Sequence, residues 1–478
     1  MNFAEIRFWQ LLCGGLAVIF FLRFWVKNPT ERFDKLALLS LGLFLLMCVS
    51  GITFLIFSVV AVGSYFGLKW ILEIHGRAPL RYLFVLIPLQ LLPLLFYKYG
   101  DFFLHTVLRW NLTSAHLWLN GVTGRDIPAL HDLIIPVGIS FYTFQKVAFV
   151  VDTLVFKEPL PRFLDYMNFA GFFPQIVAGP IERRSNLLPQ MECFRFQWNR
   201  ENIDEGASWI AVGLFFKCCL ADNLAIFFNP ASASNPYLIW AANLLFGLRI
   251  YYDFAGYSMV ALGIARCLGV RLMLNFASPY CSLSATEFWR RWHISLSQWF
   301  RDYLYIPLGG GRVTYWAFNI ALVFIVSGLW HGAGWGFVLW GAMHGLFLIL
   351  NRLAHPVIKT PPLVGWMLTT LAAFCAWLCF YETRTGVLFL KLKTLFTPGA
   401  YNFAALRAVP AQWTGPDSFA LCCFLLMATI VFVMEWLSLA KKDEPYYFLR
   451  RPVVVPILVF LTVLLAPQTN NGFIYFAF

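Results

Sequence analysis

Two histidines stand in the stretches of this chain whose residue types are best suited to chemistry. His293 lies within residues 285–312, ATEFWRRWHISLSQWFRDYLYIPLGGGR, which also hold four arginines. His331 lies within residues 327–345, SGLWHGAGWGFVLWGAMHG, between two apolar runs. An imidazole can take a proton from a hydroxyl group near physiological pH, so each histidine is a candidate general base.

The setting of His331 favours a functional role. An ionisable group at membrane depth is costly to bury, and such residues commonly mark functional sites. The alternative for His331 is a neutral imidazole that bonds a backbone carbonyl, which is the role we expect for His344. The glycines around His331 predict close approach of backbones and leave room for a substrate beside the ring.

Residues 285–305 are predicted to form one helix with two unlike faces. At about 3.6 residues per turn, one face is aromatic, and the other carries Glu287, Arg290, His293, Ser297 and Arg301. The helix is either an anchor at the membrane interface or a binding site for an anionic, phosphate-bearing substrate. In the second case, the substrate-binding residues are Arg290, Arg291, Arg301, Trp289 and Ser297.

The composition is that of a polytopic membrane protein. Of 478 residues, 60% are hydrophobic and 13% charged, whereas a soluble protein is about 45–50% apolar and about 25% charged. Lys and Arg outnumber Asp and Glu by 36 to 24, an excess that cytoplasmic loops account for. No basic soluble module stands apart, so nucleic acid is not an expected partner. The eleven cysteines show no CxxC pair or zinc-ligand spacing, so we expect neither a metal nor a cofactor.

Long apolar runs predict an all-α fold with one membrane-embedded domain over residues 1–478. A span needs roughly 20 mainly apolar residues, which predicts about ten to twelve spans here. Shorter interfacial or re-entrant helices are expected at 101–120, 164–180 and 285–305. The first run is expected to be a retained helix, not a cleaved signal peptide. The runs lie at 8–25, 36–73 (two helices broken around Ser50–Gly51), 80–98, 131–151, 207–229, 236–269, 313–330, 334–350, 363–381, 417–440 and 452–467.

Loop charge predicts the orientation of these spans. The loop at 441–451 carries four basic and two acidic residues, so we place it in the cytoplasm. Counting back, 382–416 lies on the outer face and 351–362 is cytoplasmic. The arginine-rich 290–312 then also lies on the cytoplasmic side.

The two histidine stretches resemble the signature of the membrane-bound O-acyltransferase family. The ending FIYFAF, at 473–478, is similar to the terminal motif of the branch that acetylates bacterial alginate. One departure is Met259, because that branch commonly has an aspartate there. Further pieces agree in order and place the catalytic core within 137–345, namely VGISFYTFQ (137–145), FFPQIVAGPI (172–181), YDFAGYS (252–258) and NFASPY (275–280).

The resemblance implies that His331 is the family's catalytic histidine and that His293 is a second histidine recurrent in bacterial members. It implies acetyl-CoA as a donor from the cytoplasm, with the acetyl group crossing the bacterial inner membrane to modify a secreted or cell-wall polysaccharide. It also implies two further partners, namely a periplasmic SGNH-type acetyltransferase and membrane lipids. His331 would be the base, while His293 would orient it, stabilise the oxyanion or hold the acceptor.

Two other functions stay open from the sequence. The acceptor could instead be a lipid, teichoic acid or peptidoglycan. The chain could also be a transporter or flippase in which the histidines relay protons. Transporters are often built from repeated halves, and the lack of a visible internal repeat counts against that class.

Overall fold

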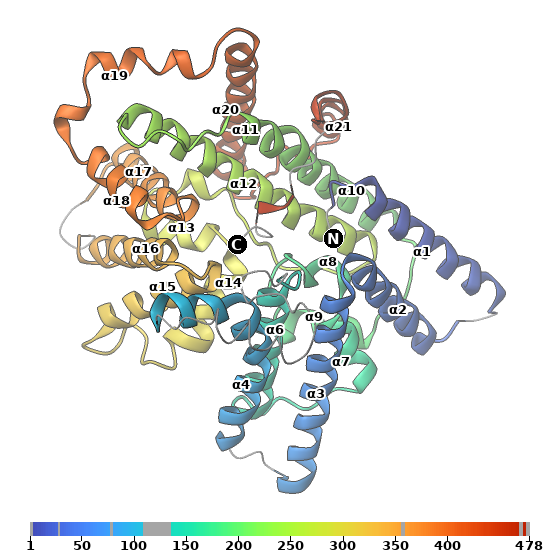
Figure 1. The fold of residues 1–478 in the computed structure, drawn as a ribbon. Coiled ribbons are helices and arrows are strands. Elements are labelled where there is room, and N and C mark those ends of the chain that lie inside the picture. The colour runs from blue at the N-terminus through green and yellow to red at the C-terminus, as the bar shows by residue number, and fades with distance from the viewer. Residues whose placement is uncertain are drawn as a thin grey trace, which may run out of the picture. The chain divides into compact units, whose positions relative to one another are not determined.

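The computed structural model describes residues 3–26, 29–76, 80–108, 135–354, 359–467 and 472–474, which form helices and loops without a strand among them (Figure 1). The all-α prediction is therefore confirmed. The chain divides into two compact units, Trp9–Phe196 and Gln197–Phe478, the second of which also includes residues 3–8. That the chain is a single membrane-embedded domain stays a prediction.

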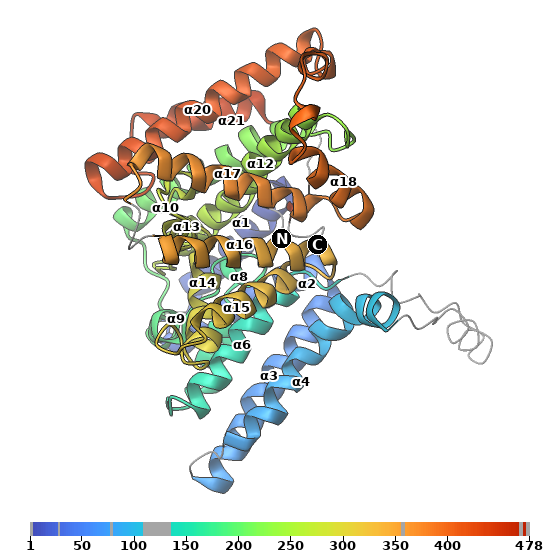
Figure 2. The ribbon, with the colours of Figure 1, turned by 90° about the vertical axis from the view of Figure 1, so that its left-hand side faces the viewer.

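The first unit confirms the predicted break at Ser50–Gly51. Ser50 has an extended backbone, and its hydroxyl accepts a hydrogen bond from the Thr53 backbone N–H at 3.3 Å, which caps the helix that follows. After this break α3 runs beside α4 (Figure 2). The helices of this unit are α1 (Ile6–Trp25, from Trp9 onward), α2 (Glu31–Val49), α3 (Gly51–His75), α4 (Leu83–Leu94), α6 (Ile139–Leu154), α7 (Phe163–Ala170), α8 (Phe173–Ile176) and α9 (Arg184–Glu192).

The second unit carries both histidines. In it α16 lies between α15 and α17 (Figure 2). Its helices are α10 (Arg200–Leu214), α11 (Asp222–Phe227), α12 (Pro236–Cys267), α13 (Ala285–Arg291), α14 (Ile294–Phe300), α15 (Trp316–His331), α16 (Trp335–Ala354), α17 (Pro362–Tyr381), α18 (Thr385–Leu395), α19 (Phe403–Arg407), α20 (Pro416–Lys442) and α21 (Val454–Leu465).

Paired glycines bring α10 and α12 into backbone contact. A Cβ on Gly206 would lie 2.6 Å from the Gly263 carbonyl oxygen, and a Cβ on Gly213 would lie 2.6 Å from that of Gly256. The two glycines of each helix, Gly206 and Gly213 on α10 and Gly256 and Gly263 on α12, are seven residues apart. Two turns of each helix therefore present a flat face to the other helix. Small residues at such spacing are typical of helix packing in membranes.

The glycines near His331 serve the packing of α15 on α16. A Cβ on Gly328 would lie 2.1 Å from the Phe337 carbonyl oxygen, and one on Gly341 would lie 2.2 Å from that of Phe324. A Cβ on Gly332 would overlap the Phe337 ring at 2.0 Å. The close approach of backbones is confirmed, but the expected room for a substrate at these glycines is wrong, because neighbouring backbone and the Phe337 ring fill it.

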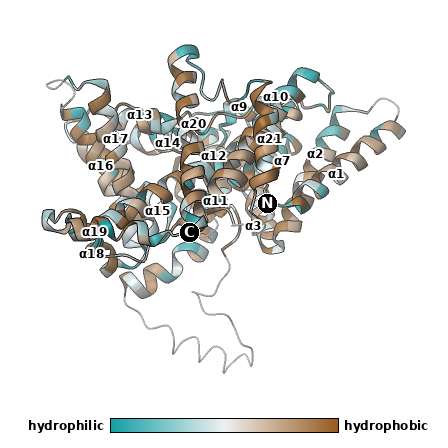
Figure 3. Cartoon of the chain, turned by 90° about the horizontal axis from the view of Figure 1, so that it is seen from above, coloured by the Kyte–Doolittle hydropathy of each residue, from teal (hydrophilic) through white to brown (hydrophobic). Residues whose placement is uncertain are grey.

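Seven of the described helical segments are long and apolar enough to cross a membrane. Figure 3 shows the apolar residues along several of them, including α16, α17 and α20. The predicted runs 313–330 and 452–467 form the shorter apolar helices α15 and α21. The run 236–269 forms α12, a 32-residue helix that carries charged side chains, so the number of spans stays a prediction. The other segments are Ile6–Trp25, Gly51–His75, Leu80–Tyr99 and Arg200–Phe227.

The predicted continuous helix over 285–305 is wrong. α13 ends at Arg291, Trp292 is extended, and His293 has a left-handed backbone with φ 42° before α14 begins. A five-residue π-helical turn, Arg301–Tyr305, follows α14. Trp292 packs against aromatic rings of other segments, among them Phe276 and Trp377 at ring-centroid distances of 5.1 and 5.0 Å. Helical periodicity cannot detect the break, because the break depends on these contacts and not on neighbouring residues.

The aromatic face of this segment packs inside the protein, so the anchor interpretation is also wrong. Phe288, Trp289, Trp292, Leu296, Trp299 and Phe300 are all buried within the second unit. Side chains that anchor a helix at the membrane interface would instead be exposed to lipid.

Candidate acyl-transfer site

Asn275 holds the residues that follow the helix break. Its Oδ1 accepts hydrogen bonds from the Ser295 backbone N–H at 3.3 Å, the Ser295 hydroxyl at 2.9 Å and His293 Nδ1 at 3.1 Å. Its backbone carbonyl accepts from the Ile294 N–H at 2.9 Å, and its Nδ2 donates to the Ser258 hydroxyl at 3.2 Å. One side chain thus ties α12 to the first turn of α14.

These contacts determine the tautomer of His293. A backbone N–H can only donate, so the Asn275 atom that faces Ser295 must be the amide oxygen. Because that oxygen can only accept, Nδ1 of His293 carries the ring proton and Nε2 is the accepting nitrogen. Burial lowers the pKa of His293 to about 3, so the ring is neutral at physiological pH.

His331 faces His293 within an aromatic enclosure. It is the last residue of α15 and only 2% exposed. The rings of Trp330, Trp340 and Phe380 lie 4.9, 4.9 and 5.3 Å from its own, measured between centroids. The His293 and His331 rings are 6.4 Å apart, so the structure brings the two predicted catalytic residues together.

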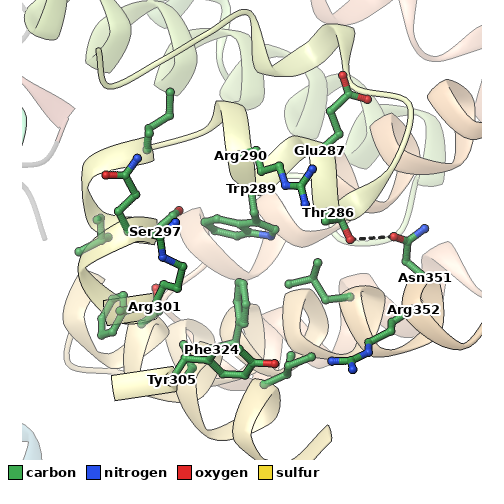
Figure 4. A pocket seen from close by; sticks show the side chains of 18 of the residues that line it. Thr286, Glu287, Trp289, Arg290, Ser297, Arg301, Tyr305, Phe324, Asn351 and Arg352 are labelled. Carbon is green, nitrogen blue, oxygen red and sulfur yellow. Dashed lines mark hydrogen bonds between the residues drawn. The ribbon is translucent and has the colours of Figure 1, made fainter. Parts of the chain in front are cut away.

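A cavity of about 840 Å³ lies in the second unit, and neither His293 nor His331 is among its lining residues (Figure 4). Ser327, one turn before His331 on α15, lines this cavity, and so does Ile294, the residue after His293. Residues four apart lie on the same face of a helix, so the cavity borders the face of α15 that carries His331. The aromatic part of the wall consists of Trp289, Phe300, Tyr305 and Phe324.

Four of the five predicted substrate-binding residues line this cavity, namely Arg290, Arg301, Trp289 and Ser297. Arg291 does not. Its guanidinium pairs with Glu287 at 2.9 Å and donates to the Ala277 carbonyl at 3.1 Å. Neighbouring arginines at the end of α13 therefore point to different places.

Arg352, at the end of α16, also lines the cavity. Loop charge predicted only that residues 351–362 are cytoplasmic. Arg352 lies across the cavity from Arg301 (Figure 4). Its guanidinium donates to the Gly311 carbonyl at 3.1 Å and lies 4.2 Å from the centroid of the Trp316 ring. A Cβ on Gly311 would lie 2.8 Å from Arg352 Nη1, so the glycine turn leaves room for this guanidinium.

The cavity carries a positive charge excess. Its one carboxylate, Glu287, is neutralised by Arg291. Arg301 shares its charge with Asp302 at 2.7 Å. Among the described residues, Arg290 and Arg352 have no carboxylate within 4 Å, so their charges are available to an anionic ligand.

The family comparison agrees with this arrangement. Residues 81–391 match the membrane-bound O-acyltransferase family, a range that contains both histidines, Asn275 and every residue lining the cavity. The chain belongs to this family.

Two of the relatives match most of the chain's length, and a third matches less than half of it. A peptidoglycan O-acetyltransferase of Helicobacter pylori is 35% identical over 407 residues, 77% of this chain and 74% of the relative. A probable alginate O-acetylase of Pseudomonas putida is 30% identical over 455 residues, 88% of this chain and 90% of the relative. A teichoic acid D-alanyltransferase of Streptococcus thermophilus is 31% identical over 238 residues, covering 45% of this chain and 56% of the relative.

As a member of the membrane-bound O-acyltransferase family, the chain is an enzyme that transfers acyl groups to hydroxyls. The interpretation of the chain as a transporter or flippase is therefore wrong. The resemblance of the histidine stretches to the family signature is confirmed, and so is the multi-pass membrane class.

The structure explains two positions, one in a family motif and one directly after another, that the sequence alone does not. Asn275 opens the quoted NFASPY motif, yet nothing in the sequence indicates that it bonds His293, eighteen residues away. Met259, which stands where the alginate branch commonly has an aspartate, is buried in α12. The hydrogen-bond acceptor for Asn275 Nδ2 is instead the hydroxyl of Ser258, the residue before Met259.

Proposed function

We propose that this enzyme transfers an acetyl group from acetyl-CoA to a hydroxyl of a cell-envelope polysaccharide, with His331 as general base. The observation that carries the proposal is the cavity in which Arg290 and Arg352 offer unneutralised charge, and which Ile294 and Ser327, close in sequence to the paired histidines, also line. Acetyl-CoA combines phosphates for the arginines with a thioester for the histidines. The names of the relatives support a polysaccharide acceptor, since they act on peptidoglycan and alginate.

The histidines have distinct roles in this proposal. His331 takes the proton of the acceptor hydroxyl, and its oxygen attacks the thioester carbonyl carbon. The C–S bond then breaks, and the CoA thiolate leaves and takes up a proton. Because Nδ1–H of His293 points to Asn275, its Nε2 can only accept, which suits it to accept a hydrogen bond from a neighbouring hydroxyl of the polysaccharide rather than to stabilise an oxyanion.

The direction of transfer follows from the loop charges. We place the cavity's arginines on the cytoplasmic side of the bacterial inner membrane, where acetyl-CoA is made, and the acceptor side in the periplasm. There the acetyl group reaches the polysaccharide either directly or through an SGNH-type acetyltransferase as partner. This partner rests on the family resemblance.

Purified protein tests the proposal with radiolabelled acetyl-CoA. In detergent it should slowly release CoA, and reconstituted in vesicles with peptidoglycan or alginate fragments it should label one of them. Release of CoA with no labelled polysaccharide, but with labelled lipid or teichoic acid, would replace the acceptor. No CoA release and no transfer would remove acetyl-CoA as donor.

Charge reversal of two neighbouring arginines should separate donor binding from folding. Because Arg290 lines the cavity, Arg290→Glu should raise the KM for acetyl-CoA roughly 10- to 100-fold, with little change in kcat. Arg291→Glu should lower the melting temperature, because Arg291 pairs with Glu287 and bonds the Ala277 carbonyl, and should leave KM within about threefold. Steady-state kinetics at low salt measures both. An equal rise in KM for the two variants would contradict the assignment of the cavity as the donor site.

Cysteine labelling should test the orientation. Thr314 and Ala408 are exposed, and both avoid the positive φ of Gly309 and Gly310, where a side chain would be strained. A membrane-impermeant maleimide added to intact spheroplasts should modify Ala408→Cys, while Thr314→Cys should react only after lysis. Peptide mass spectrometry separates these sites from native cysteines. Labelling of both from the same face would reject transfer across the membrane.

A further inference from the structure

Three strained residues cluster around the His293 side of the site. Five non-glycine residues of the described chain have positive φ, and three of them are Ser278 at 51°, His293 at 42° and Tyr446 at 61°. Such conformations cost of order 1–3 kcal/mol each and persist only where surrounding contacts hold them. The contacts that hold these three residues therefore indicate what the site requires.

A chain of hydrogen bonds leads from this cluster to a buried carboxyl group. The Ser278 backbone N–H donates to the Tyr446 hydroxyl at 3.0 Å. The Tyr446 and Tyr251 hydroxyls lie 3.1 Å apart, and the Tyr251 hydroxyl donates to Glu435 Oε1 at 2.6 Å. The chain thus joins the loop after Asn275 to α12 and α20.

With Tyr251 as the donor to Glu435, the bonds of this chain all run in one direction. The Ser278 N–H can only donate, so the Tyr446 oxygen accepts there. Tyr251 gives its proton to Glu435, so its oxygen accepts from the Tyr446 O–H. All three bonds point toward Glu435, and the chain requires a hydrogen-bond acceptor at position 435.

Glu435 is an unusual residue in its surroundings. It is 1% exposed on α20, which is long and apolar enough to span a membrane. Among the described residues no cation lies within 4 Å of it, and its ionised form would be costly to bury. A lone ionisable group at membrane depth is retained for a function.

The other end of the chain reaches the histidine. The Ala277 backbone N–H donates to the Arg291 carbonyl at 2.9 Å, and the Asn275 carbonyl accepts from the Ile294 N–H at 2.9 Å. These two bonds flank the break at Trp292 and His293. A displacement of Ser278 would therefore move Asn275 and release the side chain that it orients.

We propose that Glu435 is a positioning residue for the acyl-transfer site, acting through Tyr251 and Tyr446 on the loop that holds His293. It serves as an acceptor and not as a proton donor or a charge. The proposal rests on the proposed role of His293 in catalysis. It assigns a function to α20, which carries no family motif in the sequence.

Four variants separate acceptor chemistry from simple packing. Glu435→Gln keeps an acceptor oxygen, whereas Glu435→Leu removes it at similar size. Tyr446→Phe breaks the chain in the middle while keeping the ring. Tyr252→Phe is the matched control, because Tyr252 is also buried on α12 and bonds α20, at the Ala428 carbonyl, outside the chain.

We expect Glu435→Gln and Tyr252→Phe to keep kcat within about threefold of wild type, and Glu435→Gln to keep its pH profile. Glu435→Leu and Tyr446→Phe should lower kcat roughly 10- to 100-fold, because a buried hydroxyl or N–H loses its acceptor. The KM for acetyl-CoA should stay within about twofold of wild type, since the cavity arginines are untouched. If Glu435→Leu does not fold, Tyr446→Phe carries the test.

Hydrogen exchange by mass spectrometry gives a readout independent of activity. Peptides covering 275–281 and 290–296 should exchange faster in Tyr446→Phe and Glu435→Leu but not in Glu435→Gln or Tyr252→Phe. Wild-type kcat in both chain-breaking variants would overturn the proposal, as would a Glu435→Gln variant as inactive as Glu435→Leu. If the chain-breaking variants exchange faster but the wild type itself fails to use acetyl-CoA, the proposed function is wrong and the positioning of the loop by Glu435 still holds.

Discussion

Replacing His331 with alanine should lower acyl transfer roughly 10²- to 10⁴-fold, while the protein still inserts in the membrane and folds. A positioned general base typically contributes about 10²–10⁴-fold. The truncation leaves a void lined by Trp330, Trp340 and Phe380, which lowers stability without removing the helix that carries it. Transfer of labelled acetyl groups, with melting temperature recorded in parallel, measures both effects.

His344 provides the control for that variant. It is also a buried histidine among aromatic rings, with Trp340 at 4.8 Å and Trp289 at 5.0 Å between centroids, and it lies outside the group of His293 and Asn275. His344→Ala should create a similar void and a similar loss of stability, with kcat within about fivefold of wild type. If the two alanine variants lose activity equally, packing rather than base catalysis explains the role of His331.

Asn275→Ala should lower kcat roughly 100-fold, the second largest effect that we expect from a single change. It removes the acceptor of His293 Nδ1 and of both Ser295 groups, so the tautomer and orientation of the ring are no longer determined. Buried donors without an acceptor cost about 1–3 kcal/mol each, so the melting temperature should fall as well. The KM for acetyl-CoA should change little.

Ser258→Ala is the matched control for Asn275. It removes only the acceptor of Asn275 Nδ2 at 3.2 Å and leaves every contact of the Oδ1 atom in place. Its kcat should stay within about fivefold of wild type. An Asn275→Ala protein with wild-type kcat and altered stability alone would show that Asn275 supports the fold and not the histidine.

Much of the fold could be predicted from the chain, because it depends on local properties. Apolar runs long enough for a bilayer predicted the helices, and the break at Ser50 is visible because a serine hydroxyl caps the helix beside it. The two histidine stretches indicated the family. Each of these signals lies within about twenty consecutive residues.

The arrangement of the site could not be predicted, because its contacts join residues that are far apart in sequence. Helical periodicity placed His293 beside Arg290 on one face, whereas Asn275, eighteen residues earlier, holds His293 in a left-handed turn. Periodicity likewise could not separate Arg290 from Arg291.

The amino-acid sequence by itself determined the membrane class, the all-α fold and the family, and it indicated the two histidines as candidate catalytic residues. The tertiary structure alone decided which arginines face the cavity, that Arg352 joins them, and that Glu435 bonds Tyr251, 184 residues away. The physical reason is that hydrophobic length and helix caps act between neighbours in the chain. The direction of a buried polar side chain is instead set by whichever partner the fold brings within hydrogen-bonding distance.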